Sequence, residues 1–257
     1  MRWPRLAAGV AATALALALA ACGGNDAGAR RPDLIVSAAS SLRQAFTSYG
    51  EHFKSARVRL SFAGSDELAA QIRQGVRPDV LASANTTLPD ELHAKGLVGP
   101  PTVFAGNRLV IAVPAGAEKV RSLGDLARHG VTIAMGSASV PVGSYTRKVL
   151  SGLPAAEEKA ILANVRSNEP DVAGVVGKLT QGAVDAGFVY ITDVNATDGT
   201  LKAIALPSSL QPSVAYGAAV VTGARHPRQA RAFIAGLLRG AGRKALAAAG
   251  FEPPPAQ

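Results

Sequence analysis

The chain has 257 residues, of which 48% are apolar and 18% are charged, as is ordinary for a globular protein with a sizeable core. The formal net charge is +9, but lysine and arginine are interspersed with acidic residues, without a basic run. No helix-turn-helix or RNA-binding motif is recognisable, so the sequence argues against nucleic acid as a partner. The single cysteine excludes a disulfide within the chain.

Residues 1–22 have the pattern of an export signal. Two arginines precede an apolar run from Leu6 to Ala21, which is too short and wrongly flanked for a stable membrane span. The sequence LAAC at its end resembles the lipobox of bacterial lipoproteins. That resemblance implies that Cys22 becomes the lipid-modified first residue of the mature protein, and residues 23–32 are predicted to form a flexible tether.

The first predicted unit is a buried strand over residues 34–38, a serine-rich turn, and a helix whose apolar face runs to Phe53. Ser41, with Gln44 three residues later, fits the capping-box pattern. The first N–H groups of a helix have no intrahelical partner and suit an anion. This stretch alone favours Ser41 as a simple N-cap.

The same pattern returns along the chain. A strand over residues 58–63 leads to Ser65, the predicted N-cap of the next helix. A buried strand over residues 131–135 precedes a turn at residues 141–143 and another helix. We expect four such turns in all, and their recurrence favours a shared anion site over isolated caps.

The fourth turn lies at Asp171, the predicted cap of a helix that starts with Val172, and a later buried strand ends in Tyr190. Alternating strands and helices predict an α/β fold with mostly parallel sheets flanked by helices, in which ligands collect at the carboxyl ends of the strands.

Two long apolar strands, residues 107–113 and 214–221, fall where a chain would cross between two lobes. We therefore predict a first lobe of residues 33–107 plus 217–257 and a second lobe of residues 108–216, with the ligand cleft between them.

Seven motifs resemble, in order, the periplasmic molybdate-binding proteins of ABC importers, a family of bacterial solute-binding proteins. They span nearly the whole mature chain, and seven in order are specific although each alone is weak. The motifs are AASSL (38–42), SFAGSDELAAQI (61–72), PDVLASA (78–84), NRLVIAVP (107–114), VPVGSY (140–145), EPDV (169–172) and GFVYITD (187–193).

The resemblance implies a two-lobed periplasmic-binding-protein fold and a binding site without a cofactor, in which molybdenum is held only as its oxyanion. Gly64 departs from the serine often found there, and Val142 from alanine, which could alter the cavity volume. Carried over by motif, the ligand-binding groups are the hydroxyls of Ser41, Ser65 and Tyr190 and the main-chain amides of Val142 and Val172.

Such a set of proton donors suits a fully deprotonated tetrahedral anion, because an oxyanion that carries a proton would leave that proton without an acceptor. The resemblance further implies a monomeric protein, exported and lipid-anchored at the outer face of the cell membrane. It would capture molybdate, and also tungstate, and deliver it to the membrane subunits of an ABC permease.

Two alternatives stay open on the sequence. A binding protein for sulfate or another small oxyanion would use similar donors. A serine hydrolase would also place serines at strand-to-helix turns, but the chain has no G-x-S-x-G elbow and no histidine in a motif that would activate Ser41 or Ser65. We also expect Asp66 and Asp171 to turn away from a bound anion.

Overall fold

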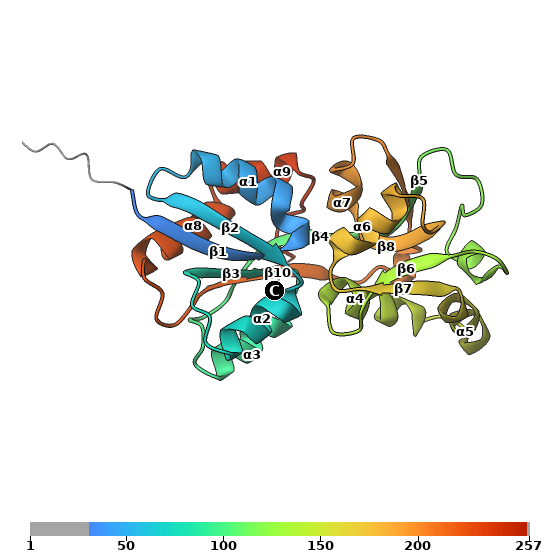
Figure 1. Cartoon of the computed structure of the whole chain (residues 1–257), viewed down its shortest axis with the longest axis horizontal. Coiled ribbons are helices and arrows are strands. Elements are labelled where there is room, and N and C mark those ends of the chain that lie inside the picture. Colours follow the sequence, from blue (N-terminus) through green and yellow to red (C-terminus); the bar gives the residue numbers. More distant parts are fainter. Residues whose placement is uncertain (1–30, 256–257) are drawn as a thin grey trace, which may run out of the picture. The chain divides into compact units, whose positions relative to one another are not determined.

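The computed structural model describes residues 31–255, and residues from Arg31 onward form one compact unit (Figure 1). The predicted signal sequence, Cys22 and residues 23–30 of the predicted tether lie outside the described residues. Within the described part, no helix combines the length and the apolar character needed to cross a bilayer.

The first sheet has five strands in the order β2-β1-β3-β10-β4. Strand β1 pairs in parallel with β2 and β3, whereas β10 runs antiparallel to both β3 and β4. The strands are β1 (Asp33–Ala39), β2 (Arg57–Ala63), β3 (Val80–Ser83), β4 (Thr102–Asn107) and β10 (Val214–Val220).

Helices cover both faces of this sheet. Successive residues of a strand point to opposite sides, and the apolar residues of β3 are buried on both sides. Val80 and Ala82 of β3 join a core that includes Phe46 and Phe233, while Leu81 between them joins a second core with Leu92. Figure 1 shows the two helical layers of the first sheet. One layer is α1 (Arg43–His52), α8 (Pro227–Leu238) and α9 (Ala241–Ala248), and the other is α2 (Ser65–Arg73) and α3 (Thr87–Ala94).

The second sheet has the order β7-β6-β8-β5-β9, with β6 parallel to β7 and β8, and β5 antiparallel to β8 and β9. Its strands are β5 (Leu109–Pro114), β6 (Ile133–Gly136), β7 (Val165–Glu169), β8 (Ala186–Tyr190) and β9 (Leu201–Ala205). Its helices are α4 (Pro141–Leu150), α5 (Ala155–Ala163), α6 (Val172–Thr180) and α7 (Ile191–Asn195). Three short 3-10 helices complete the described elements: η1 (Ser40–Leu42), η2 (Gly124–Ala127) and η3 (Ser208–Leu210).

The predicted α/β fold with two helix-flanked sheets is confirmed, and both sheets prove to be mixed. The antiparallel pairings involve β5 and β10, which lie where the chain passes from one sheet to the other. The first crossing occurs at Arg108, between β4 and β5. On the return, residues 214–216 already pair with β4 in the first sheet. The division into two lobes at residues 107 and 216 stays a prediction.

Some elements differ from those expected. The apolar run at residues 107–113 is not one strand, because Asn107 ends β4 and Leu109 begins β5 in the other sheet. Strand β7 was not predicted, since its sequence VRSNE lacks apolar alternation and it lies at a sheet edge.

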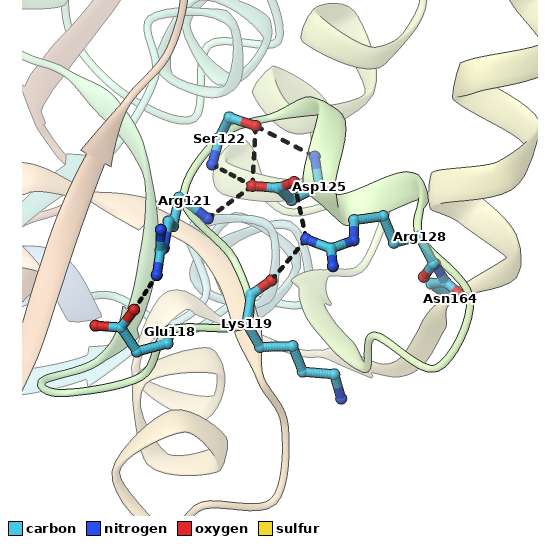
Figure 2. A network of polar contacts seen from close by, with 7 residues as sticks. All are labelled: Glu118, Lys119, Arg121, Ser122, Asp125, Arg128 and Asn164. Carbon is cyan, nitrogen blue, oxygen red and sulfur yellow. Dashed lines mark hydrogen bonds and ion pairs between the residues drawn. The ribbon is translucent and has the colours of Figure 1, made fainter.

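The 3-10 helix η2 lies within an exposed polar network (Figure 2). One carboxylate oxygen of Asp125 accepts the N–H of Arg121 at 2.9 Å and both the N–H and the hydroxyl of Ser122 at 3.0 Å. The Arg121 N–H bond, above all, holds the pKa of Asp125 below its usual value. Arg128 pairs with the other oxygen at 3.2 Å, and none of these four residues lines the cavity described next.

Candidate functional site

All five predicted site residues line one small cavity between elements of the two sheets. About 20 Å³ of it is open to the centre of a water-sized sphere, close to what a single water needs. The lining residues are Ala39, Ser40, Ser41, Ala63, Gly64, Ser65, Ala84, Val140, Pro141, Val142, Asp171, Val172 and Tyr190.

The cavity forms where strands end and helices begin. From the first sheet, β1 leads into η1 and β2 leads into α2. From the second sheet, β6, β7 and β8 lead into α4, α6 and α7. The predicted strand-to-helix turns therefore meet at one place, as expected for the carboxyl ends of strands in α/β sheets.

Ser41 does not cap a helix, so the predicted capping box with Gln44 is wrong. Residues 40–42 form the 3-10 helix η1, and α1 begins at Arg43 without a side-chain cap. The Ser41 hydroxyl instead lies 2.9 Å from the hydroxyl of Tyr216 on β10. A partner far away in the chain therefore holds this serine at the cavity.

Ser65 does not act as an N-cap either. Gly64 occupies the cap position, and Ser65 is the first residue of α2. Its hydroxyl oxygen accepts the main-chain N–H of Ala84 at 3.1 Å. Because a serine hydroxyl has one proton and this bond uses only its oxygen, the proton is free to point into the cavity.

Tyr190 presents an unsatisfied donor to the cavity. Its side chain is 1% exposed, and its hydroxyl has no hydrogen-bond partner among the described residues. Buried polar atoms are seldom left unpaired, so such an atom on a cavity wall points to a ligand. Burial raises the pKa of Tyr190 well above its ordinary value, with the charges of Tyr216, Tyr145 and Asp193 adding to the effect, so the phenol keeps its proton.

Val142 and Val172 contribute helix N-termini. Val142 follows Pro141, which has no N–H, so its amide is the first N–H of α4. Val172 is the first residue of α6, and the predicted cap Asp171 is confirmed, because its carboxylate accepts the N–H of Gly174 at 2.9 Å. The leading amides of a helix have no intrahelical acceptor and carry the positive end of its dipole.

The charge balance of the cavity is unusual for an anion site, since no lysine or arginine is among the described residues that line it. Asp66 lies outside the lining, as expected, and its carboxylate accepts the Ser139 hydroxyl at 2.6 Å. Asp171 does line the cavity, contrary to expectation, although one of its carboxylate oxygens is engaged by Gly174. Neutral donors must therefore provide the attraction for an anion.

Two of the contacts that join the elements of the first sheet to those of the second beside the cavity involve α2 and the residue before it. Asp66 of α2 and Ser139 before α4 form the hydrogen bond just described. Gly64 packs so closely on the loop before α6 that an added Cβ atom would overlap the carbonyl oxygen of Pro170. The absence of a side chain at residue 64 thus permits the close approach of the two halves of the cavity.

The cavity differs from the other hollows of the described part. A groove of about 600 Å³ between β10 and α8 is larger but mainly apolar, with Arg231 as its one charged lining residue. Nor does any group of three or more His, Cys, Asp or Glu side chains in residues 31–255 have the arrangement of a metal site. The small cavity brings together hydroxyl and amide donors from elements of both sheets.

Asp193 lies directly behind Tyr190, whose N–H donates to its carboxylate at 2.9 Å. Burial raises the pKa of Asp193 from 3.8 to about 7, against the lowering effect of this hydrogen bond and with a smaller raising effect from Asp171. Between about pH 4 and pH 7 the folded protein therefore holds a proton that the unfolded chain has lost.

It follows that the contribution of Asp193 to the free energy of unfolding falls as the pH rises through this window. We expect Asp193→Asn, which keeps an acceptor for Tyr190, to remove that fall. Urea unfolding of both proteins at several pH values measures it as a difference curve. Parallel pH profiles would contradict the assignment.

No role at the site was predicted for Tyr216 and Ala84, which contact Ser41 and Ser65, or for Asn107, which contacts Tyr216. Tyr216 lies in an apolar strand, where a tyrosine is ordinarily a core residue. Asn107 was noted only as part of a strand motif. No local sequence signal places Tyr216 next to Ser41 or Asn107 next to Tyr216.

Comparison with known proteins bears on this geometry. The sequence profile of the family described as bacterial extracellular solute-binding protein matches residues 34–252. The chain belongs to this family. Molybdate-binding protein ModA of Mycobacterium tuberculosis is 37% identical to this solute-binding protein in an alignment of 269 positions, which covers 99% of this chain and 100% of the relative. This identity over nearly the whole length of both chains confirms the predicted resemblance to molybdate-binding proteins.

Two solved structures share the fold. The periplasmic molybdate-binding protein of Azotobacter vinelandii aligns with a TM-score of 0.76 and 21% identity, over 86% of this chain and 100% of that one. The sulfate-binding protein SubI of Mycobacterium tuberculosis aligns with a TM-score of 0.77 and 19% identity, over 86% and 87%. Since both align equally well, the fold alone does not distinguish the two ligands.

Proposed function

We propose that this solute-binding protein captures molybdate, and also tungstate, in the small cavity and delivers it to an ABC permease. The ligand-binding groups are the hydroxyls of Ser41, Ser65 and Tyr190 and the amides of Val142 and Val172. The observation that carries the proposal is the buried Tyr190 hydroxyl, unpartnered within residues 31–255, on the wall of a cavity that these other donors share.

The donor set fits a fully deprotonated tetrahedral oxyanion. Each hydrogen bond to a charged acceptor contributes about 1.5 to 3 kcal/mol, so several together can offset the dehydration of the ion. An oxyanion that carries a proton would bring a donor to a site of donors, at a cost of about 1 to 3 kcal/mol for the unpaired group. The 37% identity to a molybdate-binding protein supports molybdate over sulfate as the ligand.

We further propose that the protein binds without catalysis and needs no cofactor. The family supports export from the cytoplasm. The lipid anchor at Cys22, attachment to the outer face of the membrane and a monomeric state are parts of the same proposal, supported by the LAAC sequence and the implied role beside a permease. Mass spectrometry of the membrane-extracted protein tests the anchor, and Cys22→Ala should release the protein from the membrane.

Isothermal titration of the purified protein with molybdate, tungstate, sulfate and phosphate tests the ligand assignment. We expect heat and tight binding with molybdate and tungstate, and a higher melting temperature that depends on ligand concentration. Heat from sulfate or phosphate alone would overturn the assignment. Turnover of a chromogenic ester, lost on replacing Ser41 or Ser65, would favour a hydrolase instead.

Tyr190→Phe should have opposite effects on binding and stability. Loss of one hydrogen bond to the bound anion is expected to weaken molybdate binding about 10- to 100-fold. The unliganded protein should be as stable as the wild type or more stable, because an unpaired buried hydroxyl disappears. Titration and thermal unfolding measure the two effects.

Tyr49→Phe is the matched control, because the buried Tyr49 hydroxyl donates to the carbonyl of Phe233 at 3.1 Å, among the helices of the first sheet. That variant should lose stability and keep its affinity for molybdate. A Tyr190→Phe protein that is destabilised and binds normally would show that the hydroxyl is structural.

A further inference from the structure

A chain of three buried polar side chains runs behind the cavity, from Asn107 through Tyr216 to Ser41. Asn107 is 3% exposed and Tyr216 is 0% exposed, and neither lines the cavity. The Asn107 amide nitrogen lies 3.3 Å from the Tyr216 hydroxyl, which lies 2.9 Å from the Ser41 hydroxyl. Only Ser41 of the three reaches the cavity.

The main chain fixes the direction of these hydrogen bonds. The N–H of Arg108 donates to the Asn107 side-chain oxygen at 2.9 Å, which places the amide nitrogen on the opposite side. That nitrogen donates to the Thr192 hydroxyl at 2.9 Å and to the Tyr216 hydroxyl at 3.3 Å. Because an amide NH₂ group can only donate, the Tyr216 oxygen is an acceptor in this contact.

Tyr216 must then donate to Ser41. Its hydroxyl has one proton, and among the described residues Ser41 is the acceptor that remains within reach. With the reverse direction, the buried tyrosine proton would be left without a partner, which costs free energy. Burial also raises the pKa of Tyr216 well above its ordinary value, so the proton is present.

The Ser41 oxygen thus accepts from Tyr216, and the Ser41 proton is directed to the cavity. Ser65 reaches the same state through the main-chain N–H of Ala84, which no side-chain substitution removes. For Ser41, in contrast, the direction in which the hydroxyl donates its proton depends on other side chains. Without the hydrogen bond from Tyr216, the Ser41 hydroxyl could turn and accept a proton from a ligand.

We infer that Asn107 and Tyr216 are positioning residues that hold Ser41 as a proton donor and thereby make the site reject oxyanions that carry a proton. The inference rests on the proposed function and deepens it. Tyr216 contacts Ser41, Asn107 contacts Tyr216, and neither residue lines the cavity. Their effect should therefore appear in selectivity between protonated and deprotonated anions, more than in affinity as such.

The test is the binding of molybdate, sulfate and inorganic phosphate to wild type and Tyr216→Phe at neutral pH, where phosphate carries a proton. Tyr216→Phe should lower the affinities for molybdate and for sulfate by about tenfold each, since the Ser41 hydroxyl proton is no longer directed to the cavity. The affinity for phosphate should stay the same or rise, because the Ser41 oxygen can now accept the proton of the phosphate. The preference for molybdate over phosphate is then expected to narrow by at least about tenfold.

Three comparisons decide the result. Tyr49→Phe removes another buried tyrosine hydroxyl and should leave the preference unchanged. In a Ser41→Ala background, Tyr216→Phe should not change it further, because the residue that it positions is gone. Asn107→Ala keeps the Tyr216 hydroxyl but removes the donor that fixes the direction of its hydrogen bonds. It should narrow the preference for molybdate over phosphate as Tyr216→Phe does. This variant keeps the inference testable if Tyr216→Phe fails to fold.

Equal losses for all three anions in Tyr216→Phe would overturn the inference and leave the proposed function standing. The same narrowing in the Ser41→Ala background would also overturn it. A wild-type protein that binds none of the oxyanions would overturn the proposed function and this inference with it.

Discussion

Replacing both Ser41 and Ser65 by alanine is expected to abolish molybdate binding at micromolar concentrations. Each substitution removes a proton donor to a charged ligand, which corresponds to about 10- to 100-fold in affinity. Each also leaves a buried partner unpaired, the Tyr216 hydroxyl in one case and the Ala84 N–H in the other. The unliganded double variant should therefore also melt at a lower temperature. Titration calorimetry and thermal unfolding measure the two losses separately.

Ser37→Ala is the control, because Ser37 is a buried serine of the same strand β1 that does not line the cavity. It should bind molybdate like the wild type. A double variant of Ser41 and Ser65 that folds and binds as well as the wild type would show that these hydroxyls are not the ligand donors.

Gly64→Ala should weaken binding by about tenfold or more while the protein stays folded. The new methyl group would overlap the carbonyl oxygen of Pro170 and would lie 2.8 Å from a carboxylate oxygen of Asp66. The backbone at residue 64 has φ −59°, which alanine adopts freely, so the obstacle is the approach of the loop before α6. The variant must populate a more open arrangement, and its apparent affinity falls with the fraction that can still close.

Gly177→Ala is the matched control, since an added Cβ at this position of α6 meets no atom within 4 Å. It should bind normally and gain slightly in helix stability. Calorimetry gives the affinities, and small-angle X-ray scattering with and without molybdate reports closure. Normal binding by Gly64→Ala would mean that residue 64 does not limit how closely the two halves approach.

The location of the cavity was predictable, whereas the bonding of its serines was not. The sequence places serines, helix-starting amides and a tyrosine at the ends of strands, and a parallel arrangement brings such ends together. The Asp171 cap was predicted correctly because its partner is Gly174, three residues away. Ser41 and Ser65 were predicted to cap their own helices, but their partners are Tyr216, 175 positions away, and the amide of Ala84. Local patterns carry no information on such tertiary bonds.

For the secondary structure too, local sequence patterns predicted some elements, whereas others depend on tertiary contacts. Buried strands such as β6 and β8 were found because their sequences are continuously apolar. The edge strand β7 was missed because hydrogen bonds to β6, rather than apolar burial, define it. The change of sheet at Arg108 was hidden within one apolar run, since both flanking strands are buried. For Gly64, the sequence marked the departure from serine, but only the position of Pro170 explains its consequence.

Anomalous diffraction at the molybdenum absorption edge, from crystals of the protein grown with molybdate, locates the bound ion without reference to any variant. We expect one molybdenum peak in the small cavity, with the oxyanion oxygens within hydrogen-bond distance of the Ser41, Ser65 and Tyr190 hydroxyls and the Val142 and Val172 amides. A peak elsewhere, or an oxyanion held by lysine or arginine side chains, would contradict it.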